Sequence, residues 1–245
     1  MSRKAPERPA RILAFDIGGS FLKGAVIDAK GKMLTARLKV PTPKGCTPGM
    51  MVDALARLAK PLPQHDHISI GFPGVVRGGR VLTAPHWSSR RWADFKLADA
   101  LSRRLGNTPA RLINDAEMQG LAVIQRRGLE LVLTLGTGAG TGLFRDGAIM
   151  PHLELAHHPI HKDMTYNDYV GNAALKKAGK KHWNKRVLRT IEILFSLLHY
   201  DRLYIGGGNS TRVTVKLPRN VRLVSNDAGI EGGAALWHPS MPEPH

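Results

Sequence analysis

Apolar residues near the start of the chain form short runs, followed by one stripe with helical spacing. The runs predict three strands joined by glycine-containing turns, at 11–17, 21–28 and 33–40. The stripe at 50–59 predicts a helix, with Thr47 as its cap and Pro48 at its first position. This beginning is an antiparallel meander, which differs from the strand-to-helix start of a P-loop protein.

The rest of the chain repeats this alternation of short apolar runs and helical stripes. Further strands are predicted at 67–72, 111–114, 129–135, 203–205 and 221–224, and a short stretch without an assigned type begins at 81–84. Helices are predicted at 96–105, 116–127, 166–177, 183–200 and 229–236. A strand followed by a hairpin begins each half, and a chain of 245 residues suits one large or two small domains. We divide the chain into a disordered basic tail, an N-terminal domain and a C-terminal domain, at 1–10, 11–115 and 116–245.

Two glycine-rich turns follow apolar strands and carry hydroxyl side chains. The stretch 133–147 has glycines at every second position from Gly136 to Gly142, with Thr137 between the first two. An earlier turn joins Asp16 to two glycines, a serine and Lys23. Such backbones present N–H groups to an anion, and a neighbouring carboxylate suits Mg²⁺. Taken singly, each turn is more often a tight hairpin, but the pair favours a nucleotide or polyphosphate site.

The charge balance is strongly basic, with 36 Lys and Arg against 19 Asp and Glu, a net charge of +17. A polyanionic partner, inorganic polyphosphate or nucleic acid, explains this excess, and so does a general gain in solubility. No module with interleaved aromatic residues is present, so nucleic acid is not expected. A basic stretch at 176–186 is a candidate track for a phosphate chain or, alternatively, a solvated helical face.

Other features of composition bound the location of the protein. The only cysteine, Cys46, excludes an internal disulfide and fits a reducing compartment. No apolar run approaches the roughly 20 residues that a membrane span needs. The first residues lack the apolar segment of a secretory signal. We therefore expect a cytoplasmic protein without membrane association.

Five motifs in order identify a family resemblance that extends from about residue 11 to 237. DIGGS-x-x-K, NDAE, LGTGAGTGLFRDG, ELAH and IGGGNS resemble the sugar kinases of the ROK (repressor, open reading frame, kinase) family. Within it, the chain is most similar to the polyphosphate/ATP glucokinases and glucomannokinases. The resemblance implies an actin-like ATPase (ribonuclease H-like) fold, with two α/β domains around a central cleft. It also implies phosphoryl transfer from polyphosphate or ATP to the 6-hydroxyl of glucose, mannose or both, and a homodimer.

The resemblance assigns roles to individual residues. Asp115 matches the catalytic base, although from position alone it is more often a helix cap. Asp16 matches the carboxylate that holds Mg²⁺, through water. The sugar site is implied to contain Asn114, Glu154, His157 and the backbone of Gly74. The implied phosphate and nucleotide contacts are Gly18, Gly19, Ser20, Lys23, Gly136, Thr137, Gly138, Gly140, Gly206, Gly207 and Gly208.

Several positions depart from the family pattern. Ala156 replaces a glycine in the sugar motif, and the cysteine cluster of zinc-containing members is absent, so no structural zinc is expected. Four histidines at 152–161 are expected to be surface or sugar-contacting residues rather than a metal site. Asn167 or Asp168 stands where a further sugar-binding Glu is usual, and His86 stands where many relatives have Asn. Asn167 or Asp168 and His86 stand at positions that would touch the sugar hydroxyls, so these departures are expected to alter which sugar is bound.

Two other classes of function compete with an active kinase. A ROK repressor would carry an N-terminal helix-turn-helix, and only about ten residues precede the first predicted strand, too few for that module. A kinase-like protein that binds sugar, or regulates, without catalysis is the second alternative. Retention of Asp16, Asn114 and Asp115 argues against it.

Overall fold

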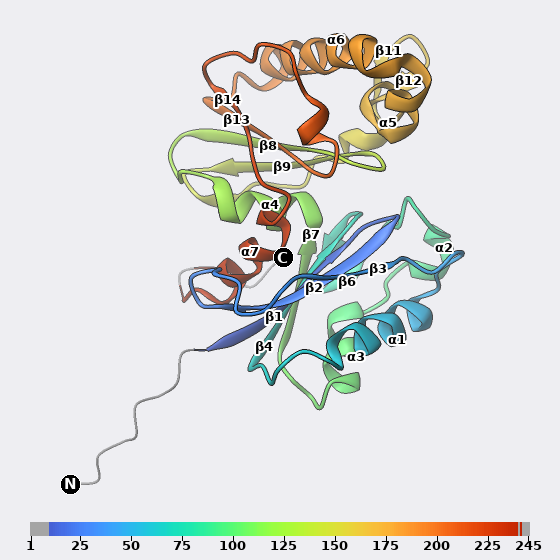
Figure 1. The fold of residues 1–245 in the computed structure, drawn as a ribbon, viewed down its shortest axis with the longest axis vertical. Coiled ribbons are helices and arrows are strands. Elements are labelled where there is room, and N and C mark those ends of the chain that lie inside the picture. Colours follow the sequence, from blue (N-terminus) through green and yellow to red (C-terminus); the bar gives the residue numbers. More distant parts are fainter. Residues whose placement is uncertain (1–9, 240, 242–245) are drawn as a thin grey trace, which may run out of the picture.

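The computed structural model describes residues 10–239 and 241, which form two lobes, each built on a five-stranded sheet (Figure 1). The first sheet has the order β3-β2-β1-β4-β7. Its strands are β1 (Arg11–Ile17), β2 (Phe21–Asp28), β3 (Leu38–Pro41), β4 (His67–Phe72) and β7 (Ala110–Asn114). The predicted basic tail lies outside the described residues except for Ala10. The predicted third strand is shorter than expected, because in its first half only Met33 bridges to β2.

The second sheet has the order β10-β9-β8-β13-β14 and the same plan. Its strands are β8 (Leu129–Leu135), β9 (Ala139–Arg145), β10 (Ala148–Ile149), β13 (Arg202–Gly206) and β14 (Val221–Leu223). In each sheet the first strand pairs antiparallel with the next along the chain and parallel with a later one. The strand-and-hairpin arrangement predicted at the start of each half is therefore present in two similar sheets, each with a hairpin turn between its first two strands.

Helices cover the outer faces of the two sheets (Figure 1). On the first, α1 (Pro48–Ala59) and α3 (Leu97–Arg104) bury their apolar stripes in one core. Thr47 Oγ1 accepts from the N–H of Met50, as the predicted cap requires. On the second sheet, α5 (Tyr166–Val170) and α6 (Asn172–Leu198) lie over another core. The helices predicted at 166–177 and 183–200 have different bounds in the structure. The first ends at Val170, and α6 then begins at Asn172 and is kinked at Gly179, whose φ is 72°.

Between the lobes lies α4 (Asp115–Val123), which contacts both sheets. The chain later returns to the first lobe through α7 (Ala228–Glu231) and the 3-10 helix η3 (Gly232–Trp237), where one helix was predicted. Ile230 and Ala234 pack on the face of the first sheet opposite α1, with Ile12 and Ala14. The boundary proposed at Asp115 coincides with the start of α4, but the last elements complete the core of the first lobe.

Short elements fill the connections between the main ones. They are the hairpin strands β5 (Val76–Arg77), β6 (Arg80–Val81), β11 (Pro159–His161) and β12 (Met164–Thr165), the helix α2 (Ser89–Trp92), and the 3-10 turns η1 (Leu155–His157) and η2 (Ser210–Arg212). No helix within residues 10–239 is long and apolar enough to cross a membrane.

Candidate active site

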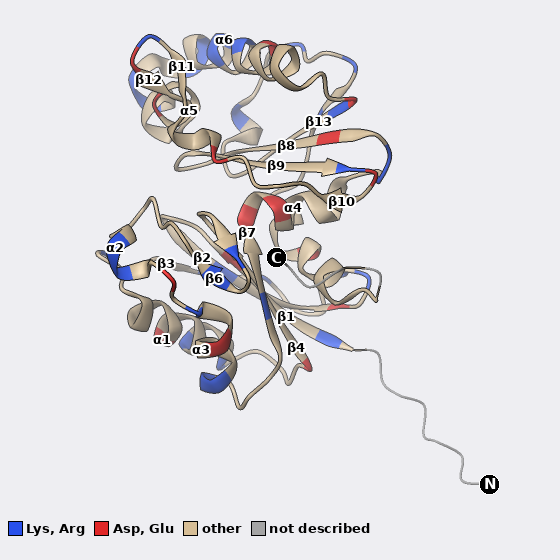
Figure 2. Cartoon of the chain, turned by 180° about the vertical axis from the view of Figure 1, so that it is seen from behind, with Lys and Arg blue, Asp and Glu red and all other residues tan. Residues whose placement is uncertain are grey.

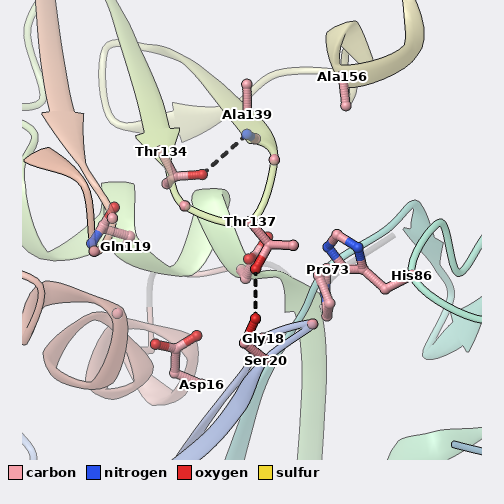
Figure 3. Close-up of a pocket in the computed structure, with 18 of the residues that line it drawn as sticks. Asp16, Gly18, Ser20, Pro73, His86, Gln119, Thr134, Thr137, Ala139 and Ala156 are labelled. Atoms are coloured by element: carbon pink, nitrogen blue, oxygen red, sulfur yellow. Dashed lines mark hydrogen bonds between the residues drawn. The ribbon is translucent and has the colours of Figure 1, made fainter. Parts of the chain in front are cut away.

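A cavity of about 330 Å³ lies between the lobes, within the size range of small-molecule sites (Figure 3). Both glycine turns, the start of α4 and the loop before η1 contribute to its wall. Most of the residues singled out in the sequence line it, namely Asp16, Gly18, Gly19, Ser20, Lys23, Gly74, His86, Asn114, Asp115, Gly136, Thr137, Gly138, Gly140, Glu154, Asn167, Gly207 and Gly208. Residues far apart in sequence therefore form one site.

The first glycine turn joins β1 to β2 and places a carboxylate beside an ammonium group. Asp16 and Lys23 are directly opposed across the two strands, and Lys23 Nζ donates to Asp16 Oδ2 at 2.6 Å. Both side chains are mostly buried, which strengthens their interaction relative to a surface pair. A Cβ at Gly19 would come 2.8 Å from the His86 ring, so glycine allows the turn to approach that side chain.

The second glycine turn joins β8 to β9 and is shaped by Asn167 from α5. Asn167 Oδ1 accepts from the N–H of Ala139 at 2.8 Å and lies 2.3 Å from where a Cβ on Gly138 would be. Thr137 Oγ1 and Ser20 Oγ are 3.1 Å apart, so the two turns meet by a hydrogen bond across the cavity (Figure 3). The amides and hydroxyls of both turns can thus act on one phosphate group.

Asp115 begins α4 directly after β7, and its position is set by Asn114. Asn114 Oδ1 accepts from the N–H groups of Ala116 and Glu117, at 2.8 and 3.3 Å, and Asn114 Nδ2 donates to the carbonyl of Gly74 at 3.1 Å. Asn114 is therefore the cap of α4 and also holds the loop after β4. The helix cap, which position alone allowed Asp115 to be, is therefore Asn114. The Asp115 carboxylate lies at the cavity.

The environment of Asp115 favours its protonated form. Burial raises the pKa of Asp115 to about 7, and the negative charges of Asp16 and Glu154 add to the rise. The N–H of Ala116, which donates to Asp115 Oδ1 at 2.9 Å, and the charge of Lys23 offset part of it. A carboxyl group with a pKa near 7 exchanges protons readily at neutral pH, which is the property of a general base.

The sugar-motif side of the cavity contains Glu154, Ala156 and His86. Burial lowers the pKa of His86, and the nearby His157 lowers it further, while Glu154 acts in the opposite direction. A largely neutral imidazole can both donate and accept a hydrogen bond. This end of the cavity therefore offers a carboxylate acceptor and an imidazole to a polyhydroxylated ligand.

Three predicted site residues lie outside the cavity wall, each for a local reason. His157 is exposed at the end of η1. Asp168 is exposed and completes the capping box of α5, where its Oδ2 accepts from Thr165 Oγ1 at 2.6 Å. Gly206 lies behind Gln119, because a Cβ there would be 2.2 Å from Gln119 Oε1. Asp168 and Gly206 therefore support neighbouring structure rather than contribute to the wall.

Some cavity residues were not singled out by the sequence. Gln119, Thr134 and Asn226 line the wall, and Gln119 is 3% exposed with no hydrogen-bond partner for Oε1 among the described residues. Thr134 Oγ1 accepts from the N–H of Gly140 at 3.1 Å. The only sequence signal for Gln119 was its spacing of four residues from Asp115, which places both on one face of α4.

Comparison with known proteins identifies the family. The profile described as the ROK family matches residues 12–163, more than half of the chain. The chain belongs to the ROK family. Among curated ROK-like relatives, the polyphosphate glucokinase of Mycobacterium tuberculosis is 26% identical over 234 residues, 89% of this chain and 88% of that one. The N-acetylmannosamine kinase of Shigella boydii is 34% identical over 143 residues, 56% of this chain and 48% of that one.

Solved structures agree with this assignment. The inorganic polyphosphate/ATP-glucomannokinase of Arthrobacter sp. strain KM matches with a TM-score of 0.84 and 30% identity, over 94% of this chain and all of that chain. A ROK family glucokinase from Streptomyces griseus, in complex with glucose and AMPPNP, has a TM-score of 0.75 at 19% identity, over 92% and 98% of the two chains. The predicted actin-like fold is confirmed, as is the class of a ROK sugar kinase.

The residues of this ROK protein fit a bound Mg²⁺. Asp16 faces the cavity, and Lys23 occupies only its Oδ2 atom, with no partner for Oδ1 in residues 10–239. Gly229 approaches this carboxylate so closely that a Cβ would be 3.1 Å from Oδ2. One carboxylate in a polar cavity suits an ion that keeps several waters and binds phosphate oxygens.

The histidines at 152–161 do not converge. Across the described part of the chain, no group of three or more His, Cys, Asp or Glu side chains is placed to hold a metal ion. His158 and His161 lie near the rings of Tyr166 and Tyr169, at 6.4 and 5.7 Å between centroids. His152 instead lies near two carboxylates, those of Glu117 and Glu154.

Proposed function

We propose that this ROK sugar kinase transfers a terminal phosphoryl group from inorganic polyphosphate or ATP to the 6-hydroxyl of glucose, with mannose as a second candidate acceptor. The observation that carries the proposal is the position of Asp115. Its carboxylate faces a cavity where two amide-rich turns meet, and burial raises its pKa to about 7. A Cβ at Gly140 would lie 3.8 Å from Asp115 Oδ1, so the second turn adjoins the base.

In the proposed reaction Asp115 accepts the proton of the sugar 6-hydroxyl while the oxygen of that hydroxyl bonds to the terminal phosphorus. The bond between that phosphorus and the bridging oxygen breaks, which leaves ADP or a polyphosphate shortened by one unit. The amides of both turns, with Lys23, hold the phosphoryl oxygens and offset their charge. Asp16 would hold Mg²⁺ through water, and the bound ion would supply further charge neutralisation. Glu154, His86 and the backbone near Gly74 orient the sugar.

The three predicted residues outside the cavity wall carry less of this proposal. His157 influences the site through the pKa of His86, and Asp168 caps α5. Gly206 makes room for Gln119, whose amide lines the donor end with Gly207 and Gly208. We assign the donor's nucleotide, when ATP is used, to this end.

The use of polyphosphate is supported by the charge on α6. Figure 2 shows Lys and Arg grouped along this helix, on the outer side of its lobe. Asn172 at the start of α6 lines the cavity, and its N–H donates to the carbonyl of Gly136 at 3.0 Å. Lys176 and Lys177 follow one turn later and are exposed, as are Lys180 and Lys181. A phosphate chain that leaves the second turn would therefore meet these ammonium groups.

A matrix of donors and sugars tests the proposal. Initial rates are measured with ATP and with polyphosphate, each against glucose, mannose and N-acetylmannosamine, with Mg²⁺ present. We expect turnover with glucose and at least one donor. Sugar binding by calorimetry without turnover under any condition would instead identify the non-catalytic alternative.

The donor preference needs a separate test, because the proposed contact with α6 concerns polyphosphate alone. The triple variant Lys176→Gln, Lys177→Gln, Lys180→Gln is expected to raise KM for polyphosphate about tenfold and to weaken its salt dependence. KM for ATP should not change. The control variant Lys30→Gln, Lys32→Gln, Lys60→Gln removes the same charge from exposed positions of the other lobe. Equal effects of the two variants would refute the track.

A cytoplasmic homodimer completes the proposal. Light scattering at several protein concentrations measures the oligomeric state. A monomer at every concentration would contradict the proposed homodimer.

A further inference from the structure

A histidine that the proposed reaction does not use connects α4 to the sugar end of the cavity. His152 Nδ1 lies 2.9 Å from Glu117 Oε1, and His152 Nε2 lies 3.6 Å from Glu154 Oε2. The side chains of His152 and Glu117 are 11% and 10% exposed, and that of Glu154 is 28% exposed. The imidazole therefore stands between a buried carboxylate behind the wall and a second carboxylate on the wall.

The backbone around this group is held in place. Thr141 Oγ1 of β9 donates to the carbonyl of Leu153 at 2.6 Å, which ties the loop that carries His152 to the second sheet. On the other side, Gly142 allows β9 to approach α4, since a Cβ there would be 3.1 Å from the Glu117 Cα. The carboxylate of Glu117 and the ring of His152 are thus presented to each other by two packed elements before any ligand binds.

The electrostatics keep the imidazole charged. Burial alone would lower the pKa of His152, but the hydrogen bond to Glu117 on α4 and the negative charges of Glu117 and of Glu154 on its own loop raise it to about 9. His86 interacts electrostatically with Glu154 and with His157. At neutral pH His152 therefore carries a proton on both nitrogens.

One of those N–H groups lacks an acceptor. Within residues 10–239 the buried Nε2 has no hydrogen-bond partner, because 3.6 Å to Glu154 is an ion-pair distance and too long for a hydrogen bond. A buried charged donor without an acceptor costs free energy that a ligand can recover. A hydroxyl placed beside Glu154 can accept from Nε2 and donate to the carboxylate at the same time.

We propose that His152, positioned by Glu117, is a specificity residue of the acceptor site, where its Nε2–H and the Glu154 carboxylate together bind one non-reacting hydroxyl of the sugar. This inference rests on the proposed sugar kinase function. It assigns to His152 a direct contact with substrate and to Glu117 a positioning role. An acceptor that lacks this hydroxyl leaves the Nε2–H group without a hydrogen-bond acceptor and the Glu154 carboxylate without this donor, so the site discriminates against it.

Deoxy sugars test the proposal. The wild type, His152→Asn and the control His158→Asn, an exposed histidine of the same segment, are assayed with glucose and with its 2-, 3- and 4-deoxy analogues. We expect one analogue to lose roughly 10- to 100-fold in kcat/KM with the wild type. In His152→Asn that penalty should shrink about tenfold, while KM for glucose rises by a similar factor and KM for the donor is unchanged. His158→Asn should behave as the wild type.

The second variant, Glu117→Gln, separates charge from folding. Glutamine retains an acceptor for Nδ1 but removes the negative charge, which lowers the pKa of His152. KM for glucose should therefore begin to rise at a lower pH than in the wild type, for which we expect the rise near pH 9. Equal losses with every sugar in His152→Asn, or no displacement of the pH profile in Glu117→Gln, would overturn the inference. If the wild type phosphorylates no sugar, the proposed function itself fails, which is a distinct result.

Discussion

Replacement of the proposed base by its neutral isostere should lower activity and raise stability together. In the structure the N–H of Ala116 donates to Asp115 Oδ1 at 2.9 Å. The side chain of Asp115→Asn keeps an oxygen that can accept this hydrogen bond, so the start of α4 should be preserved. The amide cannot accept the proton of the sugar hydroxyl. We expect kcat to fall on the order of 10²- to 10⁴-fold, the contribution of a general base.

The gain in stability follows from the pKa of Asp115, which is raised from 3.8 to about 7 in the folded protein. The folded state therefore holds the proton more tightly, and the free energy of unfolding falls as pH rises from about 4 to 7. At about 1.36 kcal/mol per pKa unit the upper limit is about 4 kcal/mol. Water in the open cavity screens the half-buried carboxylate, so we expect Asp115→Asn to raise the free energy of unfolding by about 2 kcal/mol.

Thermal unfolding of both proteins at pH 4 and pH 8, with activity assayed in parallel, measures the two effects. For a chain of this length about 2 kcal/mol corresponds to roughly 4–8 °C in Tm at pH 8, with little difference at pH 4. Asp99→Asn, at an exposed aspartate of α3, is expected to change neither activity nor Tm. The reasoning fails if Asp115→Asn keeps activity within tenfold of the wild type, or if its Tm difference is the same at both pH values.

The remaining predictions concern the charge, backbone and core around the site. Lys23→Gln removes a cation that lowers the pKa of Asp115, so the acidic limb of the kcat/KM profile should move to higher pH and kcat should fall about tenfold or more. Gly207→Ala should destabilise by about 2–4 kcal/mol in a denaturant titration, because φ is +82° and a Cβ would lie 2.5 Å from the carbonyl oxygen of Leu135. Gly208→Ala is its control, since a Cβ there meets nothing within 4 Å, and equal losses would contradict the strain argument. Tyr204→Phe removes the hydroxyl that donates to buried Glu130 at 2.8 Å, and unfolding measurements should show a loss of about 1–3 kcal/mol; an unchanged midpoint would count against it.

Local sequence determined the parts of the site that depend on neighbours in the chain. Alternating apolar runs and paired glycines specify the two hairpins, and therefore the turns that carry Gly18 and Gly136. The order of strand, Asn and Asp specifies a capped helix, so it places Asp115 at the start of α4. Short-range hydrogen bonds and side-chain alternation act within a few residues, and for this reason the pattern of the chain was sufficient to predict them.

Only the tertiary structure decided which side chains reach the cavity. Ser69 Oγ donates to the carbonyl of Gly233 at 2.7 Å across 164 positions, a contact that returns the last elements to the first sheet and that no local pattern specifies. His152 lies at the wall, whereas His157, five residues later in the sugar motif, is exposed. Burial, and with it the pKa values and free donors that make a site reactive, is set by the packing of distant segments, which the order of residues along the chain does not display.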